Sequence, residues 1–180
     1  MLGWEIFYFS EDLKVWLKRC NFVVKLQTKQ VYMKIISDRY KITIGKTHFD
    51  YEFISVGTKG EIDKLVQFIP MEVGDFYNLA FGDKDEFGEL DDLSISDNGD
   101  SQRVLATVAT AVYAFTDIYP DAFIFATGST SVRTRLYRIG ISTNFAAIKE
   151  DFDVYGLLGE DWEEFELNKP YEAFFVKRKS

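Results

Sequence analysis

An apolar segment at residues 122–126 (AFIFA) runs directly into a group of side chains that can bind an anion. The group combines a glycine, two hydroxyls and three arginines: Gly128, Ser129, Thr130, Arg133, Arg135 and Arg138. Backbone N–H groups at a helix start, hydroxyls and guanidinium groups are donors to phosphate and carboxylate oxygens. The sequence therefore predicts that residues 128–138, a strand-to-helix junction, recognise an anionic ligand or a protein partner.

The three arginines cannot all point the same way on a helix. Arg135 and Arg138 are three residues apart and share a face of the helix. Arg133 is two residues before Arg135 and therefore lies on another face. At most two of them converge on one ligand. A second interpretation stays open: surface ion pairs with the acidic middle of the chain or with residues 160–166, worth about 0–1 kcal/mol per exposed pair.

The junction must be held by a sheet. Residues 122–126 are apolar throughout, which is typical of a central strand covered on both faces. Alternating patterns and turn residues predict further strands at residues 51–56, 61–70, 75–82, 90–96, 152–158 and 171–177. The first four of these form an antiparallel meander.

Two helices are predicted where the hydrophobic period changes. Residues 97–100 can cap the first, whose apolar stripe recurs at spacings of three and four: Val104, Val108, Val112 and Phe115. Ser129 or Thr130 caps the second, which Gly140 closes. We therefore expect an α+β fold (an α/β sandwich), with two main helices on a mixed, mostly antiparallel sheet of about six to seven strands.

Residues 1–32 are set apart from this pattern as an N-terminal extension of uncertain status. Met33 opens a stretch that would make a natural beginning for the fold. We therefore expect a single α+β domain at residues 33–180.

The composition of the chain limits the classes of partner that it can bind. The chain has 180 residues, of which 47% are hydrophobic, and a formal net charge of -8, so it is globular and repels nucleic acid as a whole. Acidic residues are concentrated in the middle of the sequence, so an anion would be drawn to the Arg133 region or to the N-terminal third. No apolar run is long enough to span a membrane, and acidic residues near the N-terminus do not fit a signal peptide. These patterns predict a cytoplasmic protein with no membrane partner.

Other chemistry has little support in the sequence. Cys20 is the single cysteine and His48 the single histidine, so neither a disulfide nor a histidine-rich metal centre is expected. Carboxylates cluster at a predicted hairpin tip: Asp83, Asp85, Glu86, Glu89, Asp91 and Asp92. Their spacing is not that of a calcium loop, which favours a solvated tip over a metal site.

Several motifs resemble those of an uncharacterised bacterial family of small proteins, a domain of unknown function. They lie at residues 53–60 (FISVGTKG), 78–83 (NLAFGD), 98–100 with 104–109, and 126–130 with 133–138. The resemblance covers roughly residues 49–180. It implies no reaction.

A weaker resemblance concerns the fold. A meander followed by helix, strand, helix, strand and strand is similar to the order of the GNAT acyltransferase superfamily, and residues 136–141 (LYRIGI) are similar to the end of its later helix. This likeness implies acetyl-CoA as cofactor and Tyr137 as general acid, with Asp92 or Glu89 as base. Proton donation from a positioned side chain contributes about 10²- to 10⁴-fold. The alternative for Tyr137 is a packed aromatic ring whose hydroxyl is hydrogen-bonded.

Three hypotheses therefore stand side by side. The first is a globular domain that recognises an anionic ligand or a protein partner at residues 128–138. The second is a GNAT-like acyltransferase that uses acetyl-CoA. The third is a component of a bacterial toxin-antitoxin or defence system.

Overall fold

The computed structural model describes residues 38–179, apart from residues 46, 73, 92–93 and 95. The described residues form two helices and one nine-stranded sheet. The predicted α+β fold is confirmed, although the sheet has more strands than expected. The predicted extension at residues 1–32 lies outside the described residues.

The strands range from two to eleven residues in length. They are β1 (Thr43–Ile44), β2 (Asp50–Gly57), β3 (Gly60–Pro70), β4 (Phe76–Lys84), β5 (Leu90–Asp91), β6 (Phe123–Ala126), β7 (Phe152–Leu158), β8 (Asp161–Glu164) and β9 (Ala173–Arg178). The helices are α3 (Ser101–Ile118) and α4 (Ser131–Asp151). The extra strands β1, β5 and β8 are two to four residues long, too short to show as a periodic pattern.

The sheet order is β1-β2-β3-β4-β6-β9-β7-β8, with β5 beside the end of β4. Strands β2, β3 and β4 form the predicted antiparallel meander. Strand β6 lies in the middle of the order and pairs in parallel with β4, whereas it pairs antiparallel with β9. The β4–β6 pair is the parallel pair of the described sheet, and α3 lies in the connection between its strands.

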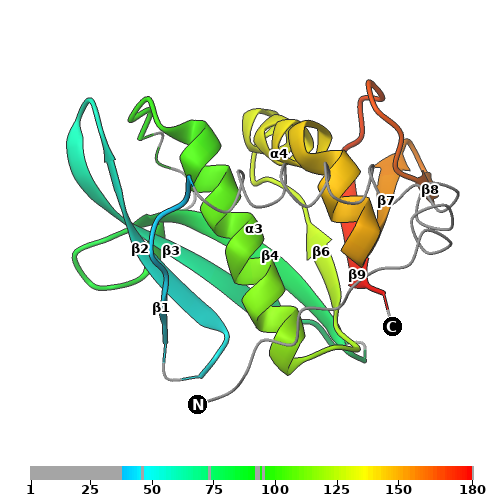
Figure 1. The fold of residues 1–180 in the computed structure, drawn as a ribbon, viewed down its shortest axis with the longest axis horizontal. Helices are drawn as coiled ribbons and strands as arrows, with labels where there is room; N and C mark the ends of the chain where they lie inside the picture. Colours follow the sequence, from blue (N-terminus) through cyan, green and yellow to red (C-terminus); the bar gives the residue numbers. More distant parts are fainter. Residues whose placement is uncertain (1–37, 46, 73, 92–93, 95, 180) are drawn as a thin grey trace, which may run out of the picture.

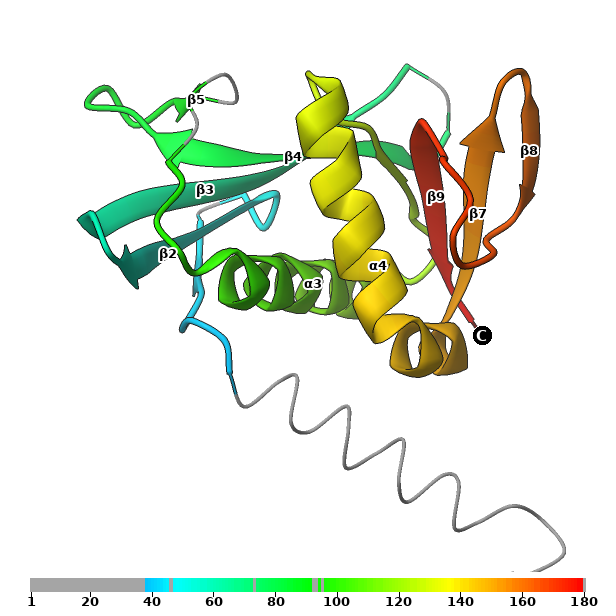
Figure 2. The ribbon, with the colours of Figure 1, turned by 90° about the horizontal axis from the view of Figure 1, so that it is seen from above.

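Both helices pack on one face of the sheet (Figures 1 and 2). Helix α3 buries the predicted stripe at Val104, Val108 and Phe115, and the ring of Phe115 stacks on Phe68 of β3 at 4.0 Å between centroids. No helix among the described residues covers the other face, so the cover of β6 on both faces stays a prediction. There Phe123 and Phe125 are half-buried against rings of the neighbouring strands.

Helix α4 is longer than predicted. It passes Gly140 and ends at Asp151. A Cβ at residue 140 would lie 3.4 Å from Leu105 of α3, an ordinary van der Waals contact, so this glycine lies where the two helices meet and does not end α4. The helix-forming sequence beyond it outweighs the roughly 1 kcal/mol that glycine costs in a helix interior.

The predicted fourth strand and the loop before β9 also differ. Of the described residues between 90 and 96, Leu90 and Asp91 pair with β4. Residues 159–168, between the predicted strands at residues 152–158 and 171–177, contain β8, which forms a hairpin with β7. His48 lies in the turn before β2 with a φ of 61°.

Two core tyrosines on neighbouring elements give opposite expectations. The Tyr51 hydroxyl is buried and has no hydrogen-bond partner among the described residues. The Tyr40 hydroxyl donates to Asp100 Oδ2 (2.7 Å) and accepts the N–H of Val56 (2.9 Å). Because an unpaired buried hydroxyl costs free energy, Tyr51→Phe should raise the free energy of unfolding by about 1 kcal/mol, and Tyr40→Phe should lower it by about 1–3 kcal/mol. Urea denaturation at pH 7 measures both.

The advantage of Tyr51→Phe should grow at alkaline pH. Burial raises the pKa of Tyr51 from 10.0 to about 12. The unfolded chain therefore ionises Tyr51 before the folded chain does, and the wild type loses stability from about pH 10 towards pH 12. A constant difference between the wild type and Tyr51→Phe across this range would contradict the assignment.

Candidate functional site

The junction between β6 and α4 is fixed by local hydrogen bonds. Thr130 is the N-cap of α4, and its hydroxyl oxygen accepts the backbone N–H of Arg133 (3.3 Å). The N–H of Gly128 donates to the hydroxyl of Thr134 (3.1 Å). A Cβ on residue 128 would lie 2.3 Å from the backbone nitrogen of Thr134, so only glycine allows the chain to pass so close to the helix.

Strands β4 and β6 part soon after they meet. They pair in register from Phe76↔Phe123 to Asn78↔Phe125, and β4 then continues to Lys84 without β6. Backbone carbonyls of alternate residues point to the same edge of a strand, and an unpaired buried carbonyl is costly. The carbonyls of Leu79 and Phe81, just beyond the last β4–β6 pair, accept hydrogen bonds from side chains of α4.

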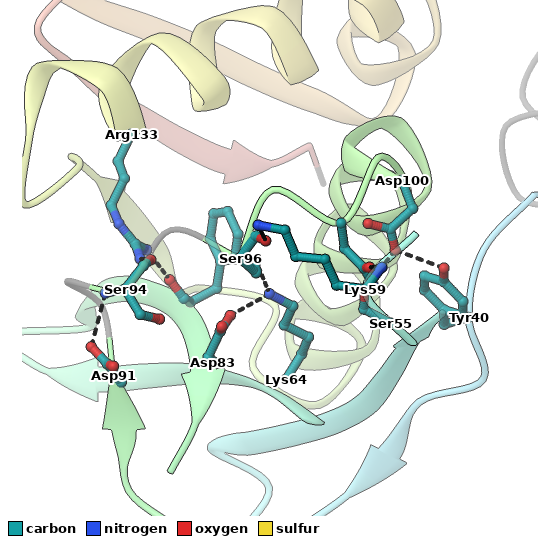
Figure 3. Close-up of polar contacts among 12 residues, drawn as sticks. Tyr40, Ser55, Lys59, Lys64, Asp83, Asp91, Ser94, Ser96, Asp100 and Arg133 are labelled. Carbon is teal, nitrogen blue, oxygen red and sulfur yellow. Dashed lines mark hydrogen bonds and ion pairs between the residues drawn. The ribbon is translucent and has the colours of Figure 1, made fainter. Parts of the chain in front are cut away.

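Arg133 and Tyr137 are those donors. The Arg133 Nη1 donates to the Phe81 carbonyl (2.8 Å) and its Nη2 donates to the Ser94 carbonyl (2.7 Å). Figure 3 shows the Arg133 side chain reaching from α4 to Ser94. The Tyr137 hydroxyl donates to the Leu79 carbonyl (3.3 Å). Helix α4 thus supplies the donors that a strand beside β4 would have supplied.

A hollow of about 200 Å³ lies where the strands part. It is lined by Asn78, Ala80 and Phe81 of β4, by Thr127, Gly128 and Ser129 of the junction, and by Arg133 and Tyr137 of α4. Three of the residues predicted for the site, Ser129, Arg133 and Tyr137, therefore meet here. Thr130 lines neither this hollow nor the groove described next, because its hydroxyl serves as the helix cap.

Arg135 and Arg138 lie on the other side of α4. They line an open groove of about 440 Å³ between the first turns of α4 and residues 170–172. Arg135 is exposed and Arg138 is half-buried. The structure thus separates Arg133 from the other two arginines, as the helical spacing predicts, and the six candidate residues do not form one site.

The positive charge at the start of α4 is not neutralised within the described part of the chain. None of Arg133, Arg135 and Arg138 has a carboxylate partner there, and the first turn of α4 carries no acidic residue. Cations near a helix N-terminus are unfavourable because the helix dipole is positive at that end. The predicted ion pairs with residues 160–166 are not formed: Glu163 and Glu166 pair with Lys169, which lowers the pKa of Glu163.

Tyr137 is packed into the core. Its side chain is buried, and its ring stands edge-on to Phe81 at 5.3 Å between centroids. Tyr137 lines the hollow together with Arg133. This geometry agrees with a packed aromatic ring, and the role of general acid stays a prediction. Of the two carboxylates considered as its base, Glu89 is exposed at the tip between β4 and β5, and Asp92 lies outside the described residues.

A second polar cluster, centred on Asp100, was not predicted from the sequence. Asp100 Oδ2 accepts hydrogen bonds from Tyr40 and from the Ser55 hydroxyl (2.6 Å), as Figure 3 shows. The Ser55 oxygen in turn accepts from Asn98 Nδ2 (2.9 Å). Burial and, second, the hydrogen bond to Asp100 raise the pKa of Tyr40 above its usual value. Asp100 was expected to cap α3, but its carboxylate makes no cap hydrogen bond and faces the sheet.

Lys64 is the buried cation of this region. Its Nζ forms an ion pair with Asp83 and donates to the hydroxyl of Ser96 (2.6 Å). Lys59 donates to the carbonyl of the same serine (2.7 Å). Lys64 lies on the same face of β3 as Val66 and Phe68, and the latter two face the core. A lysine at an inward-facing strand position was therefore the feature of the sequence that could have indicated this cluster.

Neither a metal-binding cluster nor a membrane-spanning helix is found among the described residues. No group of three or more His, Cys, Asp or Glu side chains in them is placed to hold a metal ion. In the same part of the chain, neither helix is long and apolar enough to cross a membrane.

Most of the chain matches a known protein family. Residues 36–179 match a family of unknown function, DUF6934. The chain belongs to this family. The match confirms the resemblance to an uncharacterised family and begins somewhat earlier than the roughly 49–180 expected. No curated protein and no solved structure matches the DUF6934 chain.

The Lys64–Asp83 pair can be tested by separating its partners. Lys64 is 6% exposed and Asp83 is 21% exposed. Removing one partner of such a pair leaves a charge without its counter-charge, whereas replacing both with apolar residues is often neutral. We expect Lys64→Met to lower the free energy of unfolding by about 3 kcal/mol, and the double variant Lys64→Met, Asp83→Leu to recover most of it. Urea denaturation measures this, and a double variant as unstable as Lys64→Met would refute the pairing.

Proposed function

We propose that this DUF6934 protein binds a small anionic ligand at the start of α4, with Arg133 in the hollow between β4 and β6 as the main contact. The observation that carries the proposal is a guanidinium held at a hollow by two neutral carbonyls, with no carboxylate partner among the described residues. Arg133 donates to the carbonyls of Phe81 and Ser94, and no carboxylate of the described residues neutralises it. A carboxylate or phosphate group would supply the missing counter-charge.

The chemistry of the hollow suits an oxyanion. A guanidinium has five N–H donors, and the hydrogen bonds of Arg133 to two carbonyls leave other donors for a ligand. The side chains of Asn78 and Ser129 line the same hollow. The half-buried position of Arg133 reduces solvent screening, which strengthens a charge-assisted hydrogen bond.

The overall charge favours a small ligand over a large polyanion. With a net charge of -8, the protein as a whole repels nucleic acid, whereas a small anion meets only the local field of the three arginines. Arg135 and Arg138 on the far side of α4 add to that field without touching the ligand. The proposal takes the protein to act in the bacterial cytoplasm, as the sequence suggests.

Replacement of Arg133 tests the proposal. Charge-assisted hydrogen bonds contribute about 1.5–3 kcal/mol, so Arg133→Gln should weaken binding of inorganic phosphate or acetate at least tenfold. NMR titration of the backbone amides of residues 127–134 measures the dissociation constant. Sodium chloride at matched ionic strength separates specific binding from screening.

Lys149→Gln is the matched control. Lys149 is an exposed cation in the last turn of the same helix, so its removal changes the net charge by the same amount at a distant place. We expect it to leave the affinity nearly unchanged. Equal losses in Arg133→Gln and Lys149→Gln, or no binding by the wild type, would reject the anion site.

A GNAT-like acyltransferase is the second candidate, and the strand order supports it. A meander followed by helix, strand, helix and final strands is the order that this resemblance implies, and Tyr137 lines the hollow where β4 and β6 part. The start of α3 does not fit acetyl-CoA: it carries no glycine, and Arg103 there lies over the Tyr40 ring at 4.0 Å and pairs with Asp38. We therefore assign no catalytic step to this cofactor.

Acetyl-CoA binding separates the two candidates. A ligand at about 100 times its dissociation constant stabilises the folded state by about 2.7 kcal/mol, which raises the melting temperature by roughly 5–10 °C at this size. The anion-binding proposal predicts no shift beyond that given by inorganic phosphate at the same ionic strength. A larger shift with acetyl-CoA would favour the acyltransferase, provided that desulfo-CoA or truncated CoA, which lack the acyl thioester, give no such shift when tested in its place.

A further inference from the structure

An apolar cavity lies between the two helices and the sheet, next to the hollow at Arg133. Its volume is about 90 Å³. Its walls are aliphatic and aromatic, and include Leu105 and Val108 of α3, Ile141 and Ile148 of α4, and Ile124 and Val176 of the sheet. The two small residues Ala109 and Gly140 line it from opposite helices. Helices with larger residues at these positions would fill the space.

The few polar groups at the cavity wall are turned to other partners. The Asn144 amide donates to the Gly140 carbonyl (2.9 Å) and the Tyr113 hydroxyl to Asp151 (2.8 Å). Apolar cavities of this kind stay dry, and one of about 150 Å³ binds benzene. The cavity here is smaller, so it accepts a short hydrocarbon group.

Tyr137 is the wall shared by the cavity and the hollow. The cavity is lined by Leu79 and Ala126, and the hollow by the residues that follow each of them on the same strands, Ala80 and Thr127. Tyr137 lines both spaces. Its hydroxyl donates to the Leu79 carbonyl at 3.3 Å, longer than the about 2.5–3.0 Å usual for O–H donors. A ligand that occupies both spaces must therefore displace this ring.

We propose that the two spaces bind one ligand, a short-chain aliphatic carboxylate, with its carboxylate at Arg133 and its hydrocarbon chain in the cavity beyond Tyr137. This inference rests on the proposed function and names its ligand class. The charge comes from α4 and the apolar space from both helices, so the site spans the gap that β4 and β6 leave. Phosphate binds the hollow alone, and a neutral alcohol binds the cavity alone.

A chain-length series tests the inference in the intact protein. Each buried methylene contributes about 0.8 kcal/mol, so affinity should rise about fourfold per methylene from acetate to butyrate, until the cavity is full. NMR titration reads both ends of the ligand, because the amides of residues 127–134 report the carboxylate and the methyl groups of Val108 and Ile141 report the chain. 1-Butanol should shift the methyl signals only.

Filling the cavity supplies the matched variants. Ala109→Leu should abolish the gain from acetate to butyrate and the binding of 1-butanol, while phosphate binds as before. Gly140→Ala is the milder second variant, and it favours helix formation, so it guards against a folding defect. Arg133→Gln should have the reverse effect and keep 1-butanol binding.

The outcomes separate this inference from the proposed function. No binding of acetate or phosphate by the wild type contradicts the proposed function. Binding of acetate with no gain for butyrate overturns the inference alone, and so does a gain that survives both Ala109→Leu and Gly140→Ala.

Discussion

The structure depends on the early parting of β4 and β6. The two strands share three paired positions, and beyond them β4 needs other donors for its carbonyls. Arg133 and Tyr137 of α4 meet that need. Because unpaired buried carbonyls are costly, this requirement fixes the rotation of α4 about its axis and brings a guanidinium and a phenol to the gap. The hollow and the cavity are the spaces that remain on either side of Tyr137.

The polar cluster at Asp100 supports the same arrangement from the other side. Arg133 donates to the carbonyl of Ser94, which lies in the loop between β5 and α3. That loop is held by Lys59 and Lys64 through Ser96, and by Asn98, which bonds both Ser55 and the carbonyl of Gly60. A buried lysine and a buried serine are expensive choices for stability. Their place here is explained by the loop, which must present its carbonyl to Arg133.

The sequence predicts this fold where patterns are long and local. The meander, α3, the central position of β6 and the cap of α4 all follow from alternation, helical spacing and capping residues. The sequence gives wrong predictions where tertiary contacts determine the local structure. Gly140 looks like a helix end, but it lies where α3 and α4 approach each other. Strand β8 is too short to show a period, and Asp100 looks like a cap although its carboxylate serves Tyr40 and Ser55.

The candidate site could be predicted only in part for the same reason. The spacing of the arginines separates Arg133 from Arg135 and Arg138, as observed. Arg133 also reaches β4 and the loop at Ser94. Its partner Phe81 is 52 positions away in the chain and Ser94 is 39 positions away, so no local pattern encodes these contacts. Lys64 and Ser55 occupy inward positions on their strands, and such polar residues among core residues are the sign that sequence analysis should seek.

The central claim is that Arg133 holds an anion at the gap between β4 and β6. Crystals of the full chain soaked in sodium tungstate give the most direct test, because this oxyanion is located by its anomalous scattering. The account predicts a tungstate peak within hydrogen-bond distance of the Arg133 guanidinium, in the hollow beside Ser129. A hollow without such a peak, while tungstate binds other basic residues of the same crystal, would contradict it.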